Sequence, residues 1–169
     1  LEGMLGDLLM APLTPLETVV AYVTAAATGA LITGSIALGV LVLLVPVPLA
    51  SLFPIVGFAV LGSLLFALLG FLTGMWADKW DRYAVIDTFI VMPLGLLSGT
   101  FFTPALLPET GQILMHTNPI FYLIDGFRSG FTGAAEASPL FGFLLCSTLV
   151  FGLGLLAWRL FARGWRIQS

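Results

Sequence analysis

The chain contains few charged residues. Asp, Glu, Lys and Arg make up 9% of its 169 residues, while hydrophobic residues make up 59%. Soluble domains carry about 25% charged residues, and a chain of this size has a large surface to hydrate. We therefore expect lipid, and not water, to surround most of the chain.

Cysteine, histidine and catalytic motifs are also scarce. The single cysteine, Cys146, and the single histidine, His116, exclude a disulfide framework and a cluster of Cys and His metal ligands. A net charge of −3 argues against a nucleic-acid partner. Neither GxxxxGK[ST] nor HExxH occurs. We therefore expect no enzymatic activity, no cofactor and no metal in this chain.

Long apolar runs are abundant. No charged residue occurs from Thr18 to Ala77, a run of 60 residues, whereas one membrane crossing needs about 20. Pro46 and Pro48 interrupt this run, and proline resists continuation of a helix. The run predicts two transmembrane helices, residues 18–45 and 50–76, joined by a tight hairpin.

Two further apolar segments follow a charged loop. Residues 84–102 and 139–161 are each long enough to cross the membrane, and residues 162–169 form a short tail. The predicted fold is thus all-α, a polytopic membrane bundle of about four transmembrane helices. Basic residues set its orientation. With both termini cytoplasmic, Arg128 alone lies outside, and the basic residues near the cytoplasmic side are Lys79, Arg82, Arg159, Arg163 and Arg166.

The N-terminal residues 1–14 have apolar residues at helical spacing and are too short and too charged to span. They predict an amphipathic helix on the cytoplasmic surface. Its acidic polar face suits a basic protein partner, although an ordinary interfacial helix fits as well. Thr14, Pro15 and Glu17 then have the order of a capping box, which predicts a sharp elbow at the start of the first span.

The outer stretch, residues 103–138, is too apolar for a free loop. Asn118 and Pro119 mark a helix start, and Asp125 and Arg128 have the spacing of an ion pair on one helix face. We expect short re-entrant helices here. Such backbone is tolerated in the membrane only where protein or a water-lined cavity covers it.

Some residues allow two interpretations. Asp87 lies near the start of the third span, where it is either a functional intramembrane acid or a favourable charge at a helix N-terminus.

The pairs Gly70/Gly74 and Gly95/Gly99 match the small-xxx-small pattern of helix packing.

Two motifs together resemble those of ABC-2 type permeases, the membrane subunits of bacterial exporters. They are MPLGLLSGTFF at 92–102, followed by Leu107 and Pro108, and NPIFYLIDGFR at 118–128. Residues 2–17 are similar to the cytoplasmic coupling segment of that family. The likeness is greatest to its drug, polysaccharide and nodulation-factor branch.

The resemblance implies a permease subunit of an ATP-driven exporter in a bacterial inner membrane, with a separate ABC ATPase and a second permease copy as partners. It also implies six spans, so that the first two are missing here. The residues that it implies for ATPase coupling are Glu2, Met4, Leu5, Asp7, Leu8, Thr14 and Glu17. Those implied for an outer gate are Pro93, Ser98, Gly99, Asn118, Pro119, Asp125 and Arg128.

Two other functions fit the sequence. A membrane assembly or scaffold subunit would have no nucleotide-dependent partner. An ion-coupled secondary transporter would depend on Asp87 and on an ion gradient. The transported substrate is not indicated by any residue set.

Overall fold

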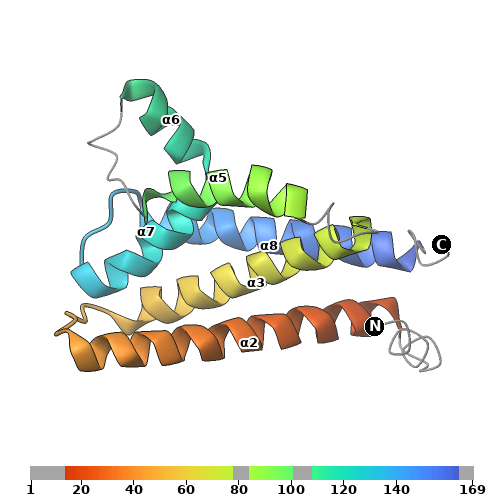
Figure 1. Ribbon diagram of the computed structural model, residues 1–169, viewed down its shortest axis with the longest axis horizontal. Helices are drawn as coiled ribbons and strands as arrows, with labels where there is room; N and C mark the ends of the chain where they lie inside the picture. Colours follow the sequence, from red (N-terminus) through yellow and green to blue (C-terminus); the bar gives the residue numbers. More distant parts are fainter. Residues whose placement is uncertain (1–13, 78–83, 101–107, 164–169) are drawn as a thin grey trace.

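The computed structural model describes residues 14–77, 84–100 and 108–163 (Figure 1). Three of its helices are long and apolar enough to cross a membrane: α2 (Pro15–Leu44), α3 (Leu52–Trp76) and α8 (Pro139–Ala162). The shortest, with 24 residues, is about 36 Å long, against roughly 30 Å of hydrocarbon. The prediction of an all-α polytopic bundle is confirmed.

Helix α2 begins at the predicted capping box, three residues before the predicted span 18–45, and it ends one residue before the end of that span. Thr14 is its N-cap, and Glu17 completes the capping box through bonds in both directions. The helix ends at Leu44, and Val45 is extended, as the residue before a proline prefers. After the hairpin, the amides of Ala50 and Ser51 donate to the carbonyl of Gly130, at 3.0 and 2.8 Å, and α3 starts at Leu52.

The third predicted span is a shorter and irregular helix, Ala84–Thr100. It contains a π-helical turn, η1 (Asp87–Val91), then α5 (Met92–Gly95) and a second π-helical turn, η2 (Leu96–Thr100). Proline cannot donate an amide hydrogen bond, and the wider turn lies directly before Pro93. The last two residues of the predicted span, 101 and 102, lie outside the described ranges.

Two further helices lie between Thr100 and α8 in the part of the chain that the structure describes, α6 (Glu109–Thr117) and α7 (Pro119–Thr132). Figure 1 shows α7 beside the first half of α3, at the end of the bundle that holds the hairpin between α2 and α3. The start of α2 and the end of α8 lie together at the opposite end. At about 21 Å, α7 is too short to cross the hydrocarbon core.

Helix α3 lies at the centre of the packing, because it contacts α2, α7 and α8. One buried cluster joins it to α7 and α8 through Phe58, Leu65, Leu123 and Cys146. A second cluster, nearer the start of α2, joins α2, α3 and α8: Val19, Val23, Leu68 and Ala157.

Much of the apolar surface is uncovered within the described chain. The buried residues of α2 all lie in its first half, and neither η1 nor α5 buries a residue. Exposed apolar side chains on this scale are typical of surfaces that meet lipid or further protein.

Candidate functional site: the broken helix and the α6–α7 return

The helix that begins at Ala84 breaks near its end. Leu97 leaves helical geometry, and Gly99 has a φ of +81°, which glycine adopts without strain. A Cβ at Gly99 would lie 3.2 Å from the ring of Phe121 in α7. Both the backbone angle and the close approach of α7 therefore require glycine here.

The break frees backbone carbonyls, and nearby polar side chains bond to them. Ser98 is fully buried; its hydroxyl donates to the carbonyl of Gly95 and lies 2.9 Å from Oγ1 of Thr100. Nδ2 of Asn118 donates to the carbonyl of Leu94 at 2.6 Å. The break is thus a stable feature, because the polar groups it frees have partners.

Asn118 also starts α7. Its Oδ1 accepts from the amide of Ile120 at 3.0 Å, and Pro119 occupies the first helical position. The predicted helix start at Asn118 and Pro119 is confirmed. One side chain, 3% exposed, therefore bonds the broken helix with its amide nitrogen and caps α7 with its oxygen. If the broken helix moves relative to α7, the bond from Asn118 to Leu94 has to break, or α7 has to move together with the broken helix.

Asp125 ties α7 to the segment that leads into α8. The residue is 3% exposed, and its carboxylate accepts from Nη2 of Arg128 at 2.9 Å. It also accepts from the amides of Glu136 and Ala137, at 3.0 and 2.9 Å. A buried carboxylate is tolerated where it has such partners.

Arg128 links two acids. Its Nη2 lies 2.9 Å from Oδ1 of Asp125 and 3.0 Å from Oε1 of Glu136. The predicted pair of Asp125 and Arg128 is confirmed. Glu136 was not predicted, because it lies eleven residues beyond Asp125 and outside any helical spacing.

Gly126 and Gly130, for which no role was predicted, let α7 approach α3. A Cβ at Gly126 would overlap the ring of Phe58, and one at Gly130 would lie 2.9 Å from the carbonyl oxygen of Ser51. Gly126 and Gly130 are four apart, the small-xxx-small spacing that brings helix backbones together. That spacing was a signal present in the sequence.

A cavity of about 330 Å³ lies between α3, η2 and α7. Phe58, Phe66 and Phe127 contribute aromatic rings to its lining, and Ser98 and Thr100 contribute hydroxyls. Of the predicted gate residues, the structure brings Ser98, Gly99 and Asn118 to the break. It places Asp125 and Arg128 further along α7.

The elbow at the other end of the bundle is also well defined. Oε2 of Glu17 accepts from the amide of Thr14 at 2.7 Å and from its hydroxyl at 2.8 Å. The amide of Glu17 donates to Oγ1 of Thr14 at 3.3 Å. The other predicted coupling residues lie outside the described ranges: Glu2, Met4, Leu5, Asp7 and Leu8.

The remaining polar candidates form no cluster in this part of the chain. Asp87 lines a small cavity of about 70 Å³ beside Gly70 and Thr73. Nothing comes within 4 Å of a Cβ built at Gly70, Gly74 or Gly95, so the described residues do not make the helix packing predicted for them. Across residues 14–77, 84–100 and 108–163, no group of side chains could hold a metal ion.

Comparison with known proteins shows the family to which the chain is similar. A family model described as "ABC-2 type transporter" matches residues 2–132. "Inner membrane transport permease YadH" of Escherichia coli strain K12 is 32% identical over 163 residues, which cover 96% of this chain and 64% of that relative. The protein of that name from Shigella flexneri matches equally. The chain thus spans 64% of the length of these curated relatives. No solved structure matches it significantly.

Proposed function

The chain belongs to the ABC-2 type transporter family, and from that premise we propose that it is the membrane permease subunit of an ATP-driven exporter. The match over residues 2–132 carries the proposal, since it runs from the predicted coupling segment to the end of α7. The relatives named as inner membrane transport permeases support an inner-membrane location and a transport activity for this chain. The substrate is a drug, a lipid or an oligosaccharide.

We assign ATP hydrolysis to a separate subunit, as the resemblance to the family implies. No GxxxxGK[ST] motif occurs in these 169 residues. Residues 1–14 contact that ATPase on the cytoplasmic side. The capping box at Thr14 and Glu17 fixes the start of α2, so that a displacement of the preceding segment passes to α2. Thr14 and Glu17 are in this sense positioning residues.

The broken helix and α7 form the outer gate. Opening and closing requires elements with two arrangements, and the break at Leu97–Gly99 is a joint where the helix direction can change. Asn118 links this joint to α7, and Asp125 links α7 to α8. A rocking of α2 and α3 therefore reaches the outer end through contacts that α3 makes with α7. Two permease copies complete the transport path.

The coupling segment provides a direct test. The complete protein is purified with its associated ATPase, and the ATPase rate is measured for wild type and for variants. Replacing Met4, Leu5 and Leu8 by glutamate should abolish the effect of the permease on ATP hydrolysis or release the ATPase. Gln168→Glu, in the predicted cytoplasmic tail, adds a charge outside the coupling segment and should behave as wild type. An unchanged ATPase rate and yield in the glutamate variant would contradict the proposal.

A further inference from the structure

Helix α7 is held by several elements of the bundle. Seven of its 14 residues are buried. The carbonyl of Gly130 accepts from the amides of Ala50 and Ser51 in the hairpin between α2 and α3, at 3.0 and 2.8 Å. From the other side, Sγ of Cys146 in α8 donates to the carbonyl of Pro119 at 3.8 Å. Helix α7 therefore forms one body with the hairpin, α3 and α8.

The broken helix is held much less. We call residues 84–96 the arm, which Figure 1 shows in light green. None of its residues is buried. Within the part of the chain that the structure describes, one hydrogen bond joins the arm to another helix, from Nδ2 of Asn118 to the carbonyl of Leu94 at 2.6 Å. Beyond the arm, Ser98 is fully buried and Gly99 lies against α7. The arm is thus attached to the bundle at the break.

Space separates the arm from α3. The cavity of about 330 Å³ is lined by Gly95 of the arm and by Phe66 of α3. A second cavity, of about 70 Å³, lies between Asp87 and Val91 of the arm and Gly70 of α3. Close-packed elements cannot slide without displacing side chains, whereas an element beside a cavity has room to shift.

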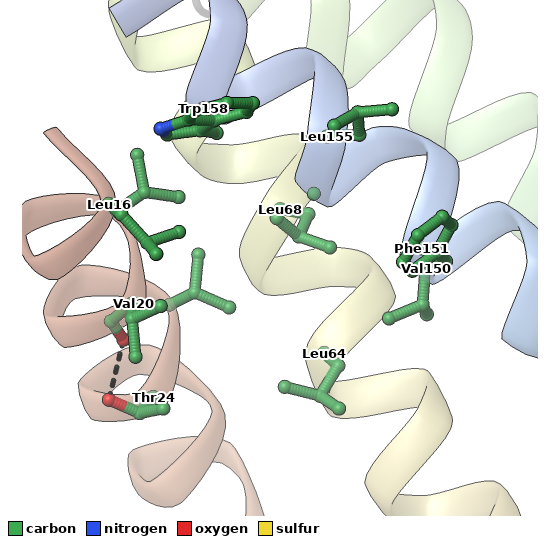
Figure 2. Close-up of a pocket in the computed structure, with 12 residues that line it drawn as sticks. Leu16, Val20, Thr24, Leu64, Leu68, Val150, Phe151, Leu155 and Trp158 are labelled. Carbon is green, nitrogen blue, oxygen red and sulfur yellow. Dashed lines mark hydrogen bonds between the residues drawn. The ribbon is translucent and has the colours of Figure 1, made fainter. Parts of the chain in front are cut away.

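Empty space alone does not identify a moving helix. A groove of about 400 Å³ also lies between α2, α3 and α8 (Figure 2). Figure 2 shows Leu68 of α3 between the other two helices, and this side chain is buried in one cluster with Val19 of α2 and Ala157 of α8. These three helices are therefore packed together beside their groove. The arm contributes no residue to either buried cluster.

We infer that the moving boundary of the outer gate lies between the arm and α7, that the arm turns at residues 97–99, and that Asn118 positions it. The inference rests on the proposed function only in treating the arm as part of a gate. Gly99 tolerates both signs of φ, so the joint can change direction. The bond from Asn118 to Leu94 has to break when the arm turns, whereas the cap on Ile120 lies within α7 and persists.

Replacement of Asn118 by serine separates its two bonds. In Asn118→Ser an oxygen still caps α7, because serine and asparagine are comparable N-cap residues. The serine hydroxyl ends one atom short of the position of Nδ2 and offers no amide to Leu94. The matched control is Ser138→Ala, which removes the N-cap of α8 and leaves the bond between Asn118 and Leu94 intact.

Distances between pairs of spin labels, measured by pulsed electron paramagnetic resonance, report the movement. The complete protein is purified with its ATPase, with native cysteines replaced and Cys146 changed to alanine. One pair joins Phe89 of the arm to Phe151 of α8, which are 73% and 75% exposed. The second pair joins Thr132, at the end of α7, to Phe151. Co-expression with an excess of unlabelled chain keeps both labels of a pair within one copy.

We expect two distance populations for the arm pair and one for the α7 pair. Loss of one neutral hydrogen bond in Asn118→Ser should change the ratio of the two arm populations by about two- to tenfold. The α7 pair should stay as in wild type, and Ser138→Ala should change neither pair. A single arm population in both wild type and Asn118→Ser would overturn the inference. So would a shift of the α7 pair together with the arm pair, because α7 would then move with the arm.

A non-hydrolysable ATP analogue, added to the wild-type complex, gives a test that does not depend on the folding of a variant. The arm populations should change and the α7 pair should not. A change in both pairs would overturn the inference. If Asn118→Ser shifts the arm and the analogue does not, the role of Asn118 stands and the proposed ATP-driven function fails.

Discussion

Replacing Asp125 should loosen the segment that joins α7 to α8. Its buried carboxylate accepts from Arg128, at 2.9 Å, and from the amides of Glu136 and Ala137, at 3.0 and 2.9 Å. A hydrogen bond to a charged group contributes about 1.5–3 kcal/mol, and loss of one partner of a buried ion pair costs about 3–5 kcal/mol. Arg128 is 35% exposed and keeps Glu136 as a partner, which favours the lower end, about 3 kcal/mol.

Amide hydrogen exchange measures this effect locally. In Asp125→Ala the amides of Glu136 and Ala137 lose their acceptor, so the segment joining α7 and α8 opens more often. Since about 1.4 kcal/mol corresponds to a factor of ten, its exchange should accelerate on the order of a hundredfold. The matched control is Glu136→Ala, which removes only a partly exposed pair contributing about 0–1 kcal/mol.

Two results would refute this account of Asp125. One is exchange at 136 and 137 in Asp125→Ala within a factor of about three of wild type, a difference well under 1 kcal/mol. The other is an equal acceleration in Glu136→Ala, which would mean that the exposed ion pair, and not the carboxylate bonds to the backbone, holds the segment.

Three further predictions follow from packing and capping. In Gly126→Ala the added methyl group overlaps the ring of Phe58 and should lower the free energy of unfolding by about 1–3 kcal/mol. In Gly152→Ala the methyl group has open space, so this control should be neutral or stabilising by up to about 1 kcal/mol. Equal effects of the two variants in thermal unfolding would contradict this packing. Thr14→Val removes the N-cap of α2 and should cost about 0.5–2 kcal/mol in the same assay, and no measurable cost would mean that the cap is not needed. Cys146 is fully buried, so a maleimide should label it only after denaturation; rapid labelling of the folded protein would contradict its packing.

The sequence predicted the features that depend on neighbouring residues. The capping box at Thr14, the hairpin at Pro46 and the start of α7 at Asn118 each follow from local backbone chemistry, and each lies where expected. The pair of Asp125 and Arg128 was predictable for the same reason, since one turn of helix brings them together.

Features that depend on contacts distant in sequence were not predicted. Asp125 accepts from backbone amides eleven and twelve residues away, which meet it only after the chain has turned at Gly133. The π-helical turns around Pro93 likewise have no marker beyond the proline itself.

Glycine spacing alone did not predict which glycine pairs pack closely against another helix. Three pairs have the same small-xxx-small pattern, yet the described chain packs closely at Gly126 and Gly130 and leaves Gly70 and Gly74 open. Spacing identifies a surface that a helix can approach closely. Which helix approaches it depends on the assembled bundle.

We propose that this chain is part of a permease that works with a separate ATPase, and purification from the native membrane is the decisive experiment. The complete protein is isolated in mild detergent, and the proteins that accompany it are identified by mass. We predict an ATPase with a P-loop in a fixed ratio to the permease. Its absence, under conditions in which a known ABC exporter keeps its ATPase, would contradict the account.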